Sequence, residues 1–143
     1  MKQFQDSTPT NIDLLCDEVE DRLSWRRRLE AVEELGKWRC NQSIHALYKR
    51  IAHDLAFPVK ELAFRKLQAF GEDVRLTKNK RGNLVPKIEK KFQLVRQRMI
   101  NPHSYDEFKA LVKELYPEAY DLYECQKGAR FDEWLQKWIN TSS

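Results

Sequence analysis

The sequence predicts an all-α fold in which antiparallel helix pairs stack into a short, right-handed solenoid. One observation is a repeat, because residues 25–38 and 57–70 carry similar side chains 32 residues apart. A repeat of fixed period is typical of stacked helical units that present a surface to a ligand. The other observation is composition, because four glycines and five prolines supply few of the turns that a many-stranded sheet needs. The matched positions are Trp25 and Phe57, Arg28 and Lys60, Ala31 and Ala63, Val32 and Phe64, Leu35 and Leu67, and Trp38 and Phe70.

The first half of the chain divides into four predicted helices with apolar residues at helical spacing. Ser24 can cap the second helix, and either Asn41 or Ser43 can cap the third. Pro58 suits the first turn of the fourth helix, and Gly71 suits its end. We expect these helices at residues 11–22, 25–38, 41–54 and 57–70.

The second half begins with a polar loop at residues 77–83 that has no apolar side chain. Ser104 and Glu107 have the spacing of a capping box, which predicts that a helix begins there. Tyr120 and Tyr123 fall in a short turn or helix that stops at Gly128. We expect helices at residues 85–100, 104–116 and 131–139.

The two repeating segments resemble the first helices of HEAT-like repeats, in particular the short bacterial kind. The resemblance is carried by Ala31-Val32-Glu33-Glu34-Leu35-Gly36 and by Val59-Lys60-Glu61-Leu62-Ala63-Phe64-Arg65-Lys66-Leu67, and it covers about residues 24–72. It implies that Ala31 and Ala63 allow close packing, and that Arg28 and Lys60 face solvent or cap carbonyl groups. The match degrades in the next 32 residues. We therefore expect repeat units at 11–72, a basic loop and helix at 75–100, and an aromatic-rich helical cap at 104–140.

The length of 143 residues predicts a single helical-repeat domain spanning residues 1–143. No run of 18 apolar residues occurs, so we expect no membrane-spanning helix. Residues 1–10 lack the apolar stretch of a signal peptide. Cys16, Cys40 and Cys125 are too widely spaced for a zinc cage, so we expect reduced thiols and a cytoplasmic location.

Charge is concentrated in one short segment. Residues 75–98 carry a net charge of +8, although the whole chain carries only +4. A basic loop leading into a basic helical face suits a phosphate backbone, which it would bind without reading sequence. The sequence therefore predicts a binding module that is not an enzyme and that contacts DNA or RNA. The predicted phosphate contacts are Arg75, Lys78, Lys80, Arg81, Lys87, Lys90, Lys91 and Arg98.

Two other interpretations of the basic segment remain open at this stage. It can dock onto an acidic protein surface, or it can be a solvated helix and loop. A protein–protein adaptor or inhibitor can instead use the repeat groove, or the acidic and aromatic residues 105–138. For Tyr116, Tyr120, Tyr123, Trp134 and Trp138 we expect a core position over a binding cage. For the run Arg26-Arg27-Arg28 we expect structural pairing with Glu30, Glu33 or Glu34, because three consecutive helical positions cannot all face one ligand.

Signals for catalysis are poor. No metalloprotease, nucleophile-elbow, phosphate-loop or dinucleotide motif occurs, and His45 and His53 stand eight residues apart. We therefore expect no cofactor, metal or small-molecule substrate. Some HEAT-like proteins are DNA glycosylases for alkylated bases, but the sequence has no motif that matches theirs.

Overall fold

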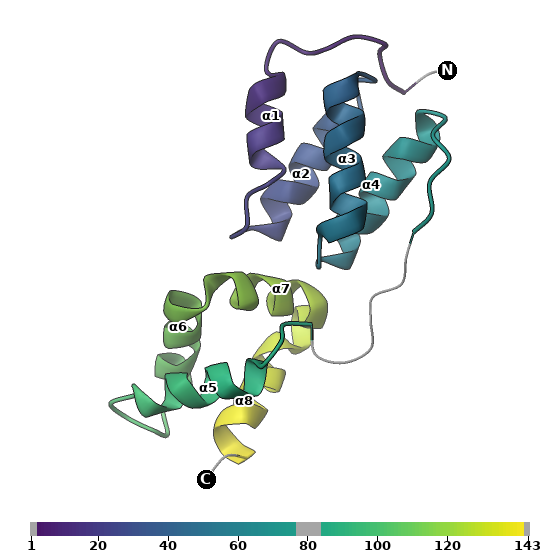
Figure 1. Ribbon diagram of the computed structural model, residues 1–143. Coiled ribbons are helices and arrows are strands. Elements are labelled where there is room, and N and C mark those ends of the chain that lie inside the picture. The colour runs from purple at the N-terminus through teal and green to yellow at the C-terminus, as the bar shows by residue number, and fades with distance from the viewer. Residues whose placement is uncertain (1–2, 77–83, 142–143) are drawn as a thin grey trace. The chain divides into compact units, whose positions relative to one another are not determined.

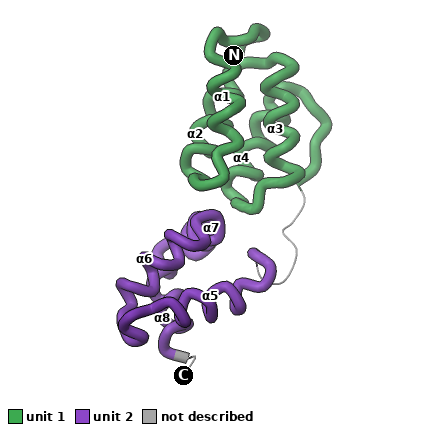
Figure 2. The backbone as a smooth tube through the Cα atoms, turned by 60° about the vertical axis from the view of Figure 1, so that its left-hand side comes forward, with its two compact units in different colours: residues 1–79 green, residues 80–143 purple. Residues whose placement is uncertain are grey.

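The computed structural model describes residues 3–76 and 84–141 and divides the chain into two compact units. Unit 1 spans residues 1–79 and unit 2 spans residues 80–143 (Figure 2). The sequence predicted one domain, whereas the close backbone contacts gather on either side of the predicted basic loop. Each unit is described below by itself.

Unit 1 contains four α-helices arranged as two packed pairs (Figure 1). Helix α1 packs against α2, and α3 packs against α4. The pairs then meet through α2 against α4 and α1 against α3, which gives two layers of two helices. The predicted all-helical fold with packed pairs is therefore confirmed for the described residues. The four helices are α1 (Ile12–Glu18), α2 (Trp25–Leu35), α3 (Asn41–His53) and α4 (Phe57–Ala69).

Local sequence explains most of the helix ends in unit 1. The Ser24 hydroxyl accepts a hydrogen bond from the Arg27 amide at 3.2 Å, as predicted for the cap of α2. Pro58 lies in the first turn of α4, and Gly71 follows that helix with a φ of 90°. The prediction for α3 was wrong, because its N-cap is Cys40 and not Asn41 or Ser43. Helices α1 and α2 also end earlier than predicted, at residues 18 and 35.

The residues of the 32-residue repeat form the seam between α2 and α4. Ala31, Leu35, Ala63 and Leu67 are all at most 1% exposed, as close packing of equivalent helices requires. The aromatic pair at the start of the repeat behaves differently, because Phe57 remains 40% exposed. The repeat therefore predicted the buried seam correctly but not the exposure of its first position.

The repeated cations are buried, which corrects the expectation that they face solvent. Arg28 is 4% exposed and Lys60 is 7% exposed. Arg28 Nη1 does cap a carbonyl, since it donates to the Asp21 oxygen at 2.8 Å. Its Nε and Nη2 donate to the two carboxylate oxygens of Asp54 at 2.9 and 3.2 Å. This bidentate pair ties α2 to the turn between α3 and α4.

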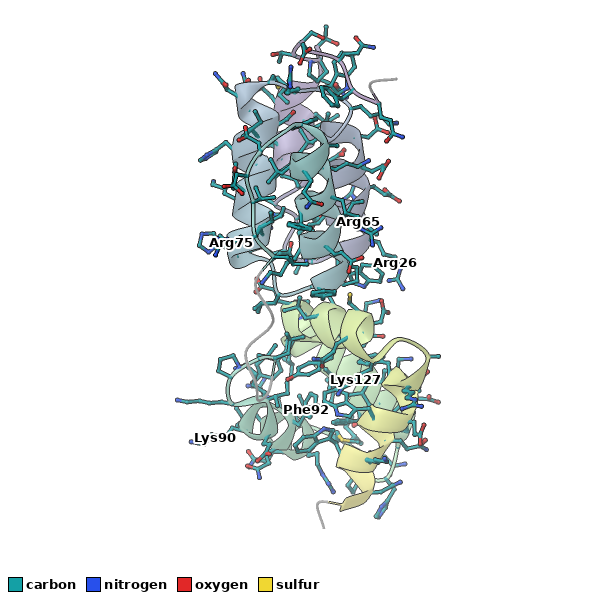
Figure 3. All side chains as sticks on the ribbon, turned by 90° about the vertical axis from the view of Figure 1, so that its right-hand side faces the viewer. Arg26, Arg65, Arg75, Lys90, Phe92 and Lys127 are labelled. Carbon is teal, nitrogen blue, oxygen red and sulfur yellow. The ribbon has the colours of Figure 1, made fainter. Side chains whose placement is uncertain are left out.

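Unit 2 has four α-helices, one 3-10 helix and a hydrophobic core of its own. Phe92 lies near the centre of that core (Figure 3) and makes edge-to-face contacts with Phe108, Trp134 and Trp138, with ring centroids 5.1–5.7 Å apart. The short turn or helix predicted around Tyr120 is a full helix, α7, that Pro117 begins. The elements are α5 (Ile88–Gln97), α6 (Tyr105–Leu115), α7 (Pro117–Lys127), the 3-10 helix η1 (Gly128–Arg130) and α8 (Phe131–Thr141).

The capping box that begins α6 forms in a modified way. The Ser104 hydroxyl accepts from the Glu107 amide at 3.2 Å, as predicted. The Glu107 carboxylate does not return to the Ser104 amide but accepts from the amides of Ile100 and Asn101. These bonds hold the turn between α5 and α6.

We expect Ser104→Ala to lower the free energy of unfolding by about 1 kcal/mol, the usual cost of a lost N-cap. Chemical denaturation followed by near-ultraviolet circular dichroism measures this loss. Ser104→Asp should restore most of it, because aspartate also caps helices and favours the positive end of the helix dipole. An Ala variant as stable as the parent would contradict the cap assignment.

Candidate nucleic-acid interface

The orientation of α5 is set by its apolar side. Ile88, Phe92 and Val95 are at most 2% exposed and face the core of unit 2, as predicted from their spacing. Because successive residues of a helix turn by about 100°, burying these three fixes which side chains point away from the core. The opposite side of α5 is the candidate interface.

Four cations of the predicted site lie on this outward side. Lys87, Lys90 and Arg98 are exposed and Lys91 is partly exposed (Lys90 is labelled in Figure 3). Helical geometry places them within roughly 100° of one another around the helix axis. No acidic side chain lies among them, since Glu89 falls on a different side. We call these four residues, with Leu94, the α5 face.

Leu94 lies at the centre of the α5 face and was not singled out from the sequence. It is 49% exposed, although the apolar residues on the other side of the same helix are buried. The sequence signal was present, because Leu94 falls off the stripe that Ile88, Phe92 and Val95 define. The arrangement is an apolar centre with a basic rim.

Lys91 is partly engaged by its own unit. Its Nζ donates to the Pro86 carbonyl oxygen at 3.1 Å and lies 5.9 Å from the ring centroid of Tyr116. An ammonium group has three donors, so two remain for a ligand. Within the described residues, Lys87, Lys90 and Arg98 form no ion pair, so their charges are not neutralised locally.

The first turn of α5 has an unusual backbone. Lys87 precedes the helix with φ 60° and ψ 31°, a left-handed conformation that a non-glycine residue adopts at some cost. Pro86 stands immediately before it, and the Pro86 carbonyl accepts the bond from Lys91. The turn therefore fixes the position of Lys87 relative to the rest of the α5 face.

The other predicted contacts are not placed with these four. Arg75 is exposed but belongs to unit 1 (Figure 3), so nothing places it beside α5. Lys78, Lys80 and Arg81 lie outside the described residues. Arg96, also on α5, turns away from the α5 face and donates to the carbonyl oxygens of Trp138 and Ile139 at 3.3 and 3.2 Å.

The arginine run in unit 1 is structural, but its partners differ from those predicted. Arg27 pairs with Asp21 at 3.4 Å, and Arg28 pairs with Asp54. Arg26 lies over the Trp25 ring at 4.7 Å from its centroid (Figure 3). The glutamates of α2 were predicted because they are near in sequence, whereas Asp54 is 26 residues away and is brought close by packing.

The aromatic residues of unit 2 form core and not an open cage, as expected. Tyr123 is 3% exposed and stacks on Trp134 with ring centroids 4.5 Å apart. Lys113 lies over Tyr120 and Lys127 lies over Trp134, at 5.6 and 5.1 Å from the ring centroids. These lysines cover the outer faces of rings whose other contacts are internal.

A polar cluster joins α6 to α8 and resembles an acid–base site only superficially. Tyr105 Oη and Lys109 Nζ donate to the same Asp132 oxygen at 2.5 and 2.6 Å. Burial, followed by the hydrogen bond to Asp132, raises the pKa of Tyr105, so the phenol stays protonated near neutral pH. The hydrogen bond from Lys109 is the main cause that lowers the pKa of Asp132. A protonated phenol and an engaged carboxylate make a structural clip, not a general base.

Comparisons with protein-family models, with curated proteins and with solved structures found no match to this chain. Among the described residues, no group of three or more His, Cys, Asp or Glu side chains could hold a metal ion. None of the described helices is both long and apolar enough to cross a bilayer. The geometry of the α5 face is therefore the basis on which a function is proposed.

Proposed function

We propose that this chain is a non-enzymatic binding module whose α5 face contacts nucleic-acid phosphates. The observation that carries the proposal is the grouping of Lys87, Lys90, Lys91 and Arg98 on one side of a helix with no acid among them. Each cation that neutralises a phosphate releases condensed counterions, which favours binding at low salt. The contacts are to the backbone, so the proposed binding does not discriminate sequence.

Unit 1 would serve as the scaffold of this module. Its two layers of helices, together with the buried seam at Ala31 and Ala63, support a short repeat array that resembles HEAT-like repeats. In this proposal the repeat supplies a rigid frame, and the specific contacts come from the segment where the repeat ends.

Docking onto an acidic protein is the second candidate, and Leu94 favours it. Protein interfaces combine an apolar centre with a polar rim, and an exposed leucine surrounded by four cations has that arrangement. A phosphate backbone gains little from the leucine. The two candidates therefore make different demands on Leu94.

We expect the double variant Lys90→Glu/Arg98→Glu to lose at least tenfold in affinity for a duplex DNA or single-stranded RNA probe. The physical reason is that two attractive contacts become repulsive, while the buried side of α5 is untouched. Fluorescence anisotropy at low salt measures the affinity, and far-ultraviolet circular dichroism checks the helical content. If all four cations of the α5 face bind phosphates, the logarithm of the affinity should fall with the logarithm of salt with a slope of about −3 to −4.

The matched control is Lys113→Glu/Arg130→Glu, which changes the net charge by the same amount in the same unit. Both residues are exposed and lie outside α5, so affinity should change less than threefold. Equal losses in the two double variants would mean that only total charge matters. A parent chain that binds neither probe at low salt would reject the proposal. In that case, nuclease-resistant co-purification that Leu94→Ala abolishes would favour the acidic protein.

A further inference from the structure

Cys40 occupies the N-cap of α3, where its thiol lies among hydrogen-bond donors. Its Sγ is 3.3 Å from the Ser43 hydroxyl. The backbone amides of Ser43 and Gln42 and the Thr8 side chain also bond to it. Burial by itself would raise the pKa of Cys40, but these hydrogen bonds outweigh it and lower the pKa. The site therefore favours a thiolate, which is the nucleophilic form of cysteine.

A second thiol lies near this group. Cys16 is on α1, which packs against α3, and both cysteines are partly exposed. Burial, and next the charge of Cys40, raise the pKa of Cys16. Asp13, Asp17 and Glu20 on and beside α1 contribute in the same direction. The two thiols are thus close enough to interact electrostatically, and their surroundings make them chemically unequal.

We propose that Cys40 and Cys16 form a peroxide-reactive thiol pair, with Cys40 as the attacking thiolate and Cys16 as the resolving thiol. The pairing uses residues of unit 1 alone and does not depend on nucleic-acid binding by α5. The functional class is a reversible modification site whose co-reactant is hydrogen peroxide or a small alkyl hydroperoxide.

The proposed chemistry has two balanced steps. The Cys40 thiolate attacks one peroxide oxygen, so a sulfur–oxygen bond forms, the oxygen–oxygen bond breaks, and hydroxide leaves and is protonated to water. Cys40 is then a sulfenic acid. The Cys16 thiolate attacks the Cys40 sulfur, so a disulfide forms and hydroxide leaves, again becoming water. In total, two thiols are oxidised to a disulfide while one peroxide is reduced to two waters.

The surroundings of Cys40 fit the first step, and the position of Cys16 fits the second. Donors around Sγ stabilise its negative charge before attack, and the fully buried Ser43 provides one of them. The resulting disulfide would join α1 to the start of α3, so it would link the two helix pairs of unit 1. A crosslink between separate elements restricts the unfolded chain and so stabilises the fold.

The test exposes the full-length reduced chain to a small molar excess of hydrogen peroxide and maps the thiols by mass spectrometry. We expect one intramolecular disulfide, between Cys16 and Cys40, that dithiothreitol reverses. Cys125, also partly exposed but in unit 2, is the internal control and should react at least tenfold more slowly. Cys16→Ser should accumulate a sulfenic acid at Cys40 that dimedone traps, whereas Cys40→Ser should form no disulfide within the chain.

A further variant separates chemistry from folding. Thr8 is exposed, so Thr8→Val removes a donor to Cys40 with little effect on packing, and it should slow oxidation of Cys40 severalfold. The proposal is overturned if Cys40 oxidises no faster than Cys125 in the folded parent chain. It is also overturned if the only disulfides that form join different molecules. Neither result would bear on binding by α5, which is measured under reducing conditions.

Discussion

Replacing Asp54 by alanine is expected to lower the free energy of unfolding of unit 1 by about 3–5 kcal/mol, the usual cost of breaking a buried ion pair from one side. The Asp54 side chain is 1% exposed and accepts from Arg28 at 2.9 and 3.2 Å and from Arg50 at 3.2 Å. It also accepts from the Ala56 amide at 2.9 Å. The substitution therefore leaves two buried or nearly buried guanidinium groups and one amide without this partner.

The expected loss comes from desolvation more than from lost attraction. The side chains of Arg28 and Arg50 are 5% and 14% exposed, so water can only partly replace the carboxylate. Arg50 Nε is already buried without a hydrogen-bond partner among the described residues. The cluster thus has little spare capacity to absorb another loss.

Hydrogen exchange with mass spectrometry measures this effect by position. Peptides from α2, α3 and α4 should lose protection in Asp54→Ala. The matched control is Glu61→Ala, which removes an exposed pair with Arg65 at 2.9 Å and should change stability by at most about 0.5 kcal/mol. Protection equal to that of the parent in Asp54→Ala would show that the buried pair contributes nothing.

Sequence reasoning located the frame of unit 1 because its signals are local. Ala31 and Ala63 stand 32 residues apart on equivalent helices, and Ser24 caps the helix that follows it. The bond between Arg28 and Asp54 could not be found in this way, because the stacking of helix pairs brings the two residues together. The nearness of Cys16 and Cys40 has the same origin.

The candidate site was predicted in part. The charge of residues 75–98 identified α5, and the spacing of Ile88, Phe92 and Val95 gave its buried side. The exposure of Leu94 depends on where the neighbouring helices end, which periodicity cannot specify. The loop cations at 78, 80 and 81 remain predictions outside the described residues.

Phe92→Ala is expected to lower the free energy of unfolding of unit 2 by about 3–5 kcal/mol, the usual range for an aromatic side chain removed from a core. Phe92 is 2% exposed and contacts three other aromatic rings. Each such ring pair contributes about 0.5–1.5 kcal/mol beyond the burial of area, so part of the loss is specific to edge-to-face geometry. Phe92→Leu should therefore recover only part of the stability, because it fills volume without restoring those contacts.

The consequence for function follows from the position of Phe92 on the same helix as the α5 face. Phe92 holds the buried side of α5, so its loss should weaken ligand binding by disordering the helix, even though Phe92 itself faces away from the ligand. Leu94→Ala, two positions later and 49% exposed, should change stability by at most about 0.5 kcal/mol. Urea denaturation followed by near-ultraviolet circular dichroism, which reports on Trp134 and Trp138, separates the two variants. If Leu94→Ala destabilised unit 2 as much as Phe92→Ala does, the assignment of buried and exposed sides of α5 would be wrong, and with it the orientation of the four cations.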